Sequence, residues 1–335
     1  MKKSLLTLTA TLGLSLVFFA TSCSSRKVAS AKASDASSAK PEEETPAKAA
    51  EKSTASNDGA DKPLTVTGEI AGSEVFIKGR TVEIWAKWCC DHEVTQAEYQ
   101  SVMGSNPSNF SGSSHPVENV SWYDAIIYCN KKSVATGRTP CYKVNGKTDT
   151  KQWGYTPHKS KDISGNITCD FTADGYRLPT EAEWEYFARG GNTSNSGQTE
   201  YSGSNTIGSI AWYDDNSGNK THEVKTKAAN ALGLYDMSGN VDEWCWDGYS
   251  GDITTSTPSD GAAPAHDRIL RGGSCDDSAS VCAVSYRRCS FPGDRYYGLN
   301  GFRVVCSVSK NDAESTAAKN ESDKKNASSS GANKP

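Results

Sequence analysis

A helix start is encoded in the segment Tyr176-Arg177-Leu178-Pro179-Thr180-Glu181-Ala182-Glu183-Trp184-Glu185-Tyr186. Thr180 and Glu183 form a capping box, so a helix is predicted from residue 181 to about residue 188. Gly190-Gly191 follows and predicts the end of this helix. Acidic residues at a helix start are favoured by the helix dipole, so a pair of catalytic carboxylates is a poor interpretation of these glutamates.

Two further helices are indicated on the N-terminal side of this segment. Thr95-Gln96-Ala97-Glu98 is a second capping box, whose helix should run to about Met103. Ser121 is a suitable cap for a helix from residue 122 to about Ala135. The remaining sequence predicts long loops rich in Gly, Ser and Asn. It also predicts short strands at residues 81–88, 269–271 and 302–305.

The composition limits the classes of protein to which this chain can belong. It has 335 residues, of which 36% are hydrophobic, and a formal net charge of −4. A strongly basic surface is therefore not expected, and no nucleic-acid partner is predicted. The 11 cysteines and 5 histidines contain no CxxC pair and no HExxH motif. A structural zinc site is accordingly not predicted.

Both ends of the chain differ in composition from its middle. Residues 1–23 resemble a lipoprotein signal peptide, with Lys2 and Lys3 before an apolar segment and Cys23 as the lipidation site. An ordinary cleaved signal peptide and an uncleaved anchor are the alternatives, and all three export the chain. Residues 24–64 and 310–335 are rich in Ala, Ser, Lys and Glu and are predicted to be a disordered tether and a disordered tail. One domain, residues 65–309, remains between them.

A series of motifs follows in order between residues 94 and 305. They are Val94-Thr95-Gln96-Ala97-Glu98-Tyr99, His115-Pro116-Val117-Glu118-Asn119-Val120-Ser121-Trp122, the segment 176–186 quoted above, Gly233-Leu234-Tyr235-Asp236-Met237-Ser238-Gly239-Asn240-Val241-Asp242-Glu243-Trp244, Arg271-Gly272-Gly273-Ser274 and Gly301-Phe302-Arg303. Together they resemble the formylglycine-generating, sulfatase-modifying enzyme family. The resemblance implies an α+β fold of the irregular C-type-lectin-like kind, with small antiparallel sheets, two to three helices and long loops.

The resemblance also implies copper(I) chemistry, because the enzymes of this family hold copper with two thiolates. Soft thiolates are suitable ligands for copper(I). The corresponding positions here are Asp277 and Cys282, so one thiolate is missing. No copper is therefore expected, and a non-catalytic protein is predicted. A shifted pair of Cys275 and Cys282 is the alternative, which the narrow geometric tolerance of a catalytic site disfavours.

Calcium is the cofactor that the resemblance implies, as a structural ion. In the family, the segment before the Glu-Trp pair wraps around a calcium ion. Here Asp236 and Glu243 would supply side-chain oxygens, and Gly239 and Val241 would supply carbonyl oxygens. Hard oxygen ligands from an irregular loop are those that calcium prefers. The alternative is that Asp236 and Glu243 only cap turns.

Disulfides are expected among the cysteines after Cys23, because an exported chain meets an oxidising compartment. Spacing alone does not determine their connectivity. The candidate pairs are Cys129 with Cys306, which the resemblance implies, Cys141 with Cys169, and Cys245 with Cys282.

Residues 275–300 form the most informative segment for function. They contain no Lys, Glu, Gln, Met or Trp, although the rest of the chain is rich in Lys and Glu. The residue types that remain are those that substituting the adenines of Asn codons can give. The segment resembles the variable region of lectin-fold proteins that diversity-generating retroelements diversify, among them treponemal surface lipoproteins of the formylglycine-enzyme subfamily.

In such proteins, fixed residues hold the loop and varied residues form an exposed ligand-binding face. Tyr and Arg are typical of binding hot spots, and Ser, Gly and Asn make adaptable contacts. The fixed residues here would be Ala279, Cys282, Arg287, Pro292 and Arg295. The face would consist of Cys275, Asp276, Asp277, Ser278, Ser280, Val281, Tyr286, Arg288, Cys289, Ser290, Phe291, Gly293, Asp294, Tyr296, Tyr297, Leu299 and Asn300. Cys275 and Cys289 would then be free and exposed. An ordinary lectin-like loop is the alternative.

The sequence thus predicts a non-catalytic, lipid-anchored protein of the cell envelope, displayed at the outer-membrane surface. It would bind a protein or another surface ligand through residues 275–300. The alternatives are a copper-dependent formylglycine-generating oxidase and a structural envelope lipoprotein. A varied face is selected and not inherited, so the sequence does not name the ligand.

Overall fold

Three α-helices begin at the caps that the sequence predicts. The computed structural model describes residues 63–261, 266–295 and 299–306, which belong to one compact unit. The side chains of Thr95, Ser121 and Thr180 each accept a hydrogen bond from the backbone N–H three residues later, within a capping box. The helices are α1 (Gln96–Met103), α2 (Trp122–Ala135) and α3 (Glu181–Ala188). A short α4 (Asp214–Ser217) and the 3₁₀ helices η1 (Thr150–Gln152), η2 (Ile207–Ser209) and η3 (Ala279–Cys282) were not predicted.

Short strands form four small sheets in the described part of the chain. Two of these sheets are antiparallel pairs, β1 (Leu64–Thr67) with β2 (Thr81–Ile84) and β4 (Tyr142–Val144) with β5 (Ile167–Cys169). In a third sheet, β11 (Val305–Cys306) lies between β3 (Trp88–Cys89) and β6 (Tyr176–Arg177). The fourth has the order β10 (Asn300–Gly301), β7 (Asp242–Gly248), β8 (Arg268–Arg271), β9 (Arg288–Ser290), and its β10–β7 pairing is parallel. The predicted α+β class with small, mostly antiparallel sheets is confirmed.

The strand predictions need correction. Residues 81–88 contain two strands, β2 and β3, which belong to different sheets. The strand predicted at residues 302–305 begins only at Val305. The seven-residue strand β7 was missed altogether, because all its residues are buried and three of them are acidic. Such a strand lacks the alternation of apolar and polar residues by which strands are recognised.

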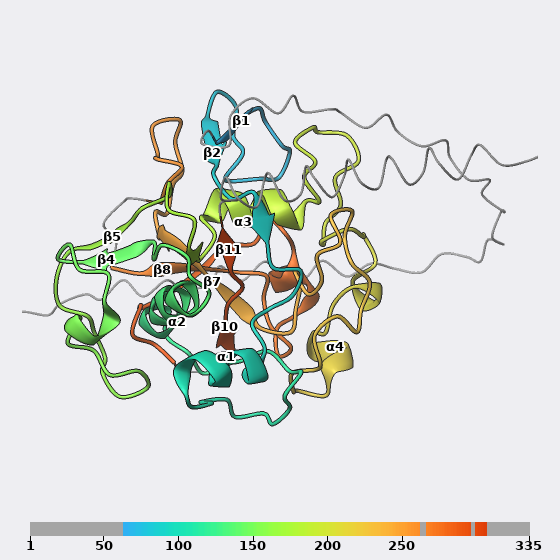
Figure 1. Cartoon of the computed structure of the whole chain (residues 1–335). Coiled ribbons are helices and arrows are strands. Elements are labelled where there is room, and N and C mark those ends of the chain that lie inside the picture. Colours follow the sequence, from blue (N-terminus) through green and yellow to red (C-terminus); the bar gives the residue numbers. More distant parts are fainter. Residues whose placement is uncertain (1–62, 262–265, 296–298, 307–335) are drawn as a thin grey trace, which may run out of the picture. The chain divides into compact units, whose positions relative to one another are not determined.

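The helices surround the central strands (Figure 1), with α3 on one side and α1 on the other. α2 packs against α1 and β6, while α3 packs against β2, β7 and β8. The buried indoles of two tryptophans connect α2 and the residue before its cap with β7. The Nε1–H of Trp122 donates to the carbonyl of Cys245 at 2.9 Å, and that of Trp244 donates to the carbonyl of Val120 at 2.9 Å. Each indole therefore buries a large apolar surface while its polar atom stays satisfied.

The three glutamates of the segment 176–186 are partners of buried arginines. The pairs are Glu183 with Arg177, Glu185 with Arg271 and Glu181 with Arg287. Arg271 belongs to β8 and Arg287 to the segment 275–300, so α3 fixes the positions of both. Removing one partner of a buried pair leaves an uncompensated charge. These carboxylates thus have a structural role, and their ion pairs with the arginines contribute more to the fold than their interaction with the helix dipole.

The predicted disulfides are not formed. The free thiols include Cys129, Cys141, Cys169, Cys245 and Cys282, so none of the three candidate pairs is joined. Tyr142 is the Cα partner of Cys169 in the β4–β5 ribbon. Cys141 precedes β4, and its Sγ lies 3.9 Å from the carbonyl oxygen of Ala173. Cys245 and Cys282 lie in separate apolar clusters, which explains why they do not meet.

The predicted signal peptide with Cys23, most of the tether and the predicted tail lie outside the described residues. Leu64, predicted as the last residue of the tether, is instead the first residue of β1 and pairs with Ile84. Among the described residues, no helix has the length and apolar character needed to span a bilayer.

Candidate functional site

Two arginines anchor the segment 275–300 to the starts of two helices. Arg287 donates from Nε and Nη2 to the two carboxylate oxygens of Glu181, at 2.6 and 2.9 Å. Arg295 donates from Nε to Oδ2 of Asp124 at 2.7 Å. Glu181 is the first residue of α3, and Asp124 is the capping-box partner of Ser121 in α2. Paired guanidinium–carboxylate bonds fix orientation as well as distance. Both arginines were predicted as fixed residues of the loop.

The predicted binding face is partly exposed. Its exposed residues are Asp276, Ser278, Ser280 and Phe291. Its half-buried residues are Asp277, Val281, Tyr286, Arg288, Cys289, Ser290, Gly293, Asp294 and Leu299. Tyr296 and Tyr297 lie outside the described residues.

The structure corrects the prediction for three residues, two of which, Cys275 and Asn300, are the buried ends of the segment. Cys275 is fully buried, and its carbonyl accepts a hydrogen bond from the Ser217 hydroxyl at 2.6 Å. Asn300 is buried because it forms β10 and pairs with Asp242 of β7. Cys289 is half-buried within β9 and not exposed. The exposed part of the predicted binding face is therefore narrower than the segment 275–300 that the sequence singles out.

Arg288 is held by two carboxylates of the protein itself. Its Nη2 lies 2.5 Å from Oδ1 of Asp277, and its Nη1 lies 2.5 Å from Oδ2 of Asp242. Asp277 also accepts hydrogen bonds from the backbone N–H and the hydroxyl of Ser274, at 3.0 and 2.6 Å. Burial raises the pKa of Asp242 to about 7, although Arg288 acts to lower it. Asp277 and Arg288, both predicted for ligand contact, thus hold the loop in place.

Asp277 and Cys282, the two positions at which the family resemblance implies copper ligands, carry a salt-bridged carboxylate and a buried thiol. The thiol is that of Cys282, whose Sγ lies 3.9 Å from the carbonyl oxygen of Ser274. Burial and the nearby Asp277 carboxylate raise the pKa of Cys282 above its usual range. Burial likewise raises the pKa of Cys275 to about 12. Reactive thiolates are found in electropositive, partly exposed surroundings, and neither of these buried thiols has them.

A cleft of about 670 Å³ opens beside residues 291–295. Phe291, Gly293 and Asp294 of the predicted face line it, together with Pro292 and Arg295 of the framework. Sequence reasoning missed the other lining residues, which are Asn119, Tyr123, Lys161, Asp162, His266 and Arg268. They come from three distant segments, and only the pairing of β8 with β9, which sets Arg268 opposite Ser290, brings some of them to the loop.

The cleft combines aromatic surface with charges of both signs. Phe291 is 50% exposed and meets the ring of His266 edge to face, with centroids 4.7 Å apart. The guanidinium of Arg268 lies 4.1 Å from the ring centroid of Trp122. Burial lowers the pKa of Arg268, against the opposing effect of Asp247. An exposed aromatic beside fixed polar groups is typical of a binding site for an amphipathic ligand.

The residues predicted for calcium are buried and lie in or next to β7. The residues are Asp236, Gly239, Val241 and Glu243. Glu243 is committed to Arg303, which donates from Nε and Nη2 to its two oxygens at 2.7 Å each. Asp236 accepts from the backbone N–H of Lys225 through Oδ2, while its buried Oδ1 has no hydrogen-bond partner. The unpaired Oδ1 of Asp236 suits a cation, whereas the charge of Glu243 is already balanced by Arg303. The four residues therefore fit a calcium ion only in part.

Comparisons with known proteins agree with the motifs. The family described as sulfatase-modifying factor enzyme 1-like domain matches residues 64–308. Chaperone protein LppX of Paenibacillus barcinonensis is 40% identical over 233 residues, which are 64% of this chain and 78% of that protein. A formylglycine-generating enzyme of Thermomonospora curvata is 28% identical over 235 residues, 63% of this chain and 62% of the enzyme. Among solved structures, Treponema denticola variable protein 1 matches with a TM-score of 0.64 and 39% identity, over 73% of this chain and 94% of that chain.

Proposed function

The chain belongs to the sulfatase-modifying factor enzyme 1-like family, and from this premise we propose that it is a non-catalytic lipoprotein of the cell envelope that binds a ligand through residues 275–300. The ligand is a protein or another molecule presented at a surface. The observation that carries this proposal is the cleft of about 670 Å³, because one wall of it is formed by the exposed Phe291 together with Gly293 and Asp294.

A rigid frame around this wall supports a binding role. Arg287 and Arg295 attach the segment to α3 and α2, so an exposed residue between them, such as Phe291, can change while both anchors stay in place. Preorganised loops bind with a smaller entropic cost than mobile ones. An arrangement of fixed anchors with exposed side chains between them is what a diversified binding face requires. The 39% identity to a protein named variable protein 1 from Treponema denticola supports the same interpretation.

The composition of the segment leads to a proposal about its origin. We infer that it is diversified by a retroelement that replaces adenines. The test is to compare the gene with a nearby near-repeat of the stretch that encodes residues 275–300. Differences confined to adenines are expected, and differences spread over all four bases would contradict this origin.

The binding proposal is tested with peptides selected from a displayed library on the purified full chain. Truncation of a buried aromatic anchor costs about 2 kcal/mol or more, or at least roughly a 30-fold loss of affinity. Phe291→Ala should therefore weaken the selected peptides by that factor. Leu232→Ala is the matched control, because Leu232 is 48% exposed and lies outside the cleft lining. Peptides that bind Phe291→Ala as tightly as the wild type would refute the proposed face.

The envelope location rests on the N-terminal sequence. Lipid attachment at Cys23 would tether the domain to a membrane, since a lipid chain contributes about 0.8 kcal/mol per buried CH₂ group. Growth with a radiolabelled fatty acid should label the wild type and not Cys23→Ser. Protease treatment of intact cells then tests display at the outer-membrane surface, because only a surface-displayed domain is cleaved.

A structural calcium ion at Asp236 is the remaining part of the proposal. The buried Oδ1 of Asp236 supports it, since an oxygen without a hydrogen-bond partner is costly to bury unless a cation or a water satisfies it. The carbonyl oxygens of Gly239 and Val241 would complete the ligand set from the same turn. No role in a reaction is assigned to this ion.

A further inference from the structure

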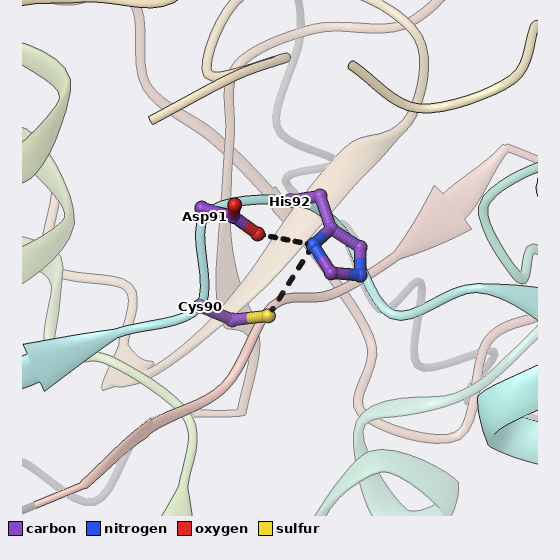
Figure 2. Close-up of side chains that lie close together, drawn as sticks. All are labelled: Cys90, Asp91 and His92. Carbon is purple, nitrogen blue, oxygen red and sulfur yellow. Dashed lines mark hydrogen bonds and ion pairs between the residues drawn. The ribbon is translucent and has the colours of Figure 1, made fainter. Parts of the chain in front are cut away.

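A cysteine, an aspartate and a histidine that follow one another directly bring three different ligand atoms together. Figure 2 shows that the side chains of Cys90 and Asp91 both point toward the ring of His92. Its Nδ1 lies 3.7 Å from Sγ of Cys90 and is also bonded to Oδ1 of Asp91. The sulfur, nitrogen and oxygen atoms all lie within 4.8 Å of one another. This is the one such group of three or more Cys, His, Asp or Glu residues found in the part of the chain that the structure describes.

The spacing of these atoms is that of two corners of a zinc tetrahedron. Zn–S bonds are about 2.3 Å and Zn–N bonds about 2.0–2.1 Å, so sulfur and nitrogen on one tetrahedral zinc ion lie about 3.6 Å apart. The observed separation of Cys90 Sγ and His92 Nδ1 is 3.7 Å. Little movement is therefore needed for both atoms to meet one ion. Oδ1 of Asp91 lies closer to Nδ1 of His92 than two ligand atoms of one zinc ion do, so the carboxylate must move outward slightly.

A second layer of residues already orients the histidine and the aspartate. Glu98 places Oε2 3.4 Å from Nε2 of His92, the nitrogen that faces away from the cluster. The capping box of α1 holds this carboxylate, because the backbone N–H of Thr95 donates to the same oxygen at 2.9 Å. Lys225 holds the other oxygen of Asp91, with Nζ 2.6 Å from Oδ2. Metal-binding histidines commonly donate their second N–H to a carboxylate, and this outer layer tunes affinity.

The cluster is buried on the side of Cys90 and open to solvent on the side of Asp91 and His92. Cys90 is buried in the main apolar cluster, whereas the side chains of Asp91 and His92 are 43% and 21% exposed. A metal ion could thus enter from solvent and keep one position open to water. The neighbouring Cys89 is not part of this group of ligand atoms, because it packs against a different apolar cluster, the one that contains Trp184.

We propose that Cys90, Asp91 and His92 form a binding site for a zinc ion, with the sulfur, a carboxylate oxygen and Nδ1 as ligands and water as the fourth. A thiolate, an imidazole and a carboxylate are ligands that zinc accepts together. Their two negative charges balance the charge of the ion. On binding, the ion displaces the thiol proton of Cys90 and the proton shared by His92 and Asp91, and both protons pass to the solvent. The sequence patterns for zinc missed this site because its ligands are consecutive.

The test uses the full chain, stripped of metal with a chelator and kept reduced. Titration with zinc should show one ion bound per chain. Titration with cobalt(II), which takes the same ligands and is coloured, should show a thiolate-to-cobalt charge-transfer band. Cys90→Ala should abolish this band, and Cys89→Ala, the matched control, should keep it. Glu98→Gln should weaken zinc binding by about 10- to 100-fold, as loss of an outer-layer partner does.

Because Cys90 is buried, Cys90→Ala could unfold the domain, so His92→Ala is measured beside it and the melting temperature of each variant is recorded. Loss of zinc binding in a folded His92→Ala variant supports the site. Zinc binding by both folded variants at the affinity of the wild type would overturn it, as would a wild type that binds no zinc. Asp215→Asn, at an exposed carboxylate outside the cluster, should leave zinc affinity unchanged.

Discussion

The Nε–H of Arg295 donates to Oδ2 of Asp124 at 2.7 Å, and this bond joins the segment 275–300 to the first turn of α2. The same carboxylate oxygen accepts the backbone N–H of Ser121, so one aspartate both caps the helix and holds the loop. Burial alone would raise the pKa of Asp124, but hydrogen bonds from His158 and Arg295 hold it well below its usual value. Asp124 is therefore ionised at neutral pH, and the guanidinium of Arg295 compensates its buried charge.

Arg295→Ala should destabilise the domain by about 3 kcal/mol, because it leaves the carboxylate of Asp124 buried without its guanidinium partner. Chemical denaturation of the wild type and the variant measures this loss. Lys143→Ala is the matched control. Its ion pair with Asp170 is 39% exposed on both sides, so the loss should be at most about 1 kcal/mol. Equal losses in the two variants would show that Arg295 is not an anchor.

Asp247 should make stability decrease with pH between about 4 and 8. Burial, together with the charge of the neighbouring Glu181, raises the pKa of Asp247 to about 8. Its pKa in the unfolded chain is about 4, so folding takes up a proton in this window and is disfavoured as pH rises. The effect reaches about 1.4 kcal/mol per pH unit for one proton. Denaturant unfolding at several pH values measures the slope.

In Asp247→Asn this slope should be smaller by about one proton per molecule. Asp170→Asn, at a half-exposed carboxyl, should leave the slope unchanged across the same window. A slope that is identical in wild type and Asp247→Asn would show that Asp247 is ionised in the folded protein.

Calcium should raise the melting temperature of the wild type and not that of Asp236→Asn. At a hundredfold excess over Kd, a ligand stabilises the folded state by about 2.7 kcal/mol, or roughly 5–10 °C for a domain of this size. Thermal unfolding with calcium and with a calcium chelator measures the shift. Asp215→Asn, at an exposed carboxylate, is the control that should still respond. No calcium-dependent shift in the wild type would remove the ion from the proposal.

Incubation with copper, oxygen and a Cys-x-Pro-x-Arg peptide should give no formylglycine above the rate without protein. The reason is that Asp277 is bonded to Arg288 and Ser274, and Cys282 is a buried thiol of raised pKa. Mass spectrometry of the peptide measures the product, with an active formylglycine-generating enzyme as the positive control. Formylglycine in the sample with this chain would make it an oxidase and overturn the non-catalytic assignment.

The local sequence determined the three capped helices, the family and the missing thiolate. Thr95, Ser121 and Thr180 cap helices through atoms within three residues of themselves, so the sequence alone contains the information. Asp277 at the place of a thiolate is likewise a fact of the sequence. The two loop anchors, Arg287 and Arg295, were also recognised as fixed, although their partners were not.

The contacts between residues far apart in the sequence became known only from the tertiary structure. The carboxylate partners of Arg287 and Arg295 lie more than a hundred residues away, and the pairing of β8 with β9 brings Arg268 to the loop. The burial of Cys275, Asn300 and β7 also depends on contacts that no local pattern records. Caps and motifs act through neighbours in the chain, whereas burial, ion pairing and cleft shape arise from packing between distant segments. The sequence therefore determined the three capped helices and the family, and packing decided which part of the segment 275–300 stays exposed.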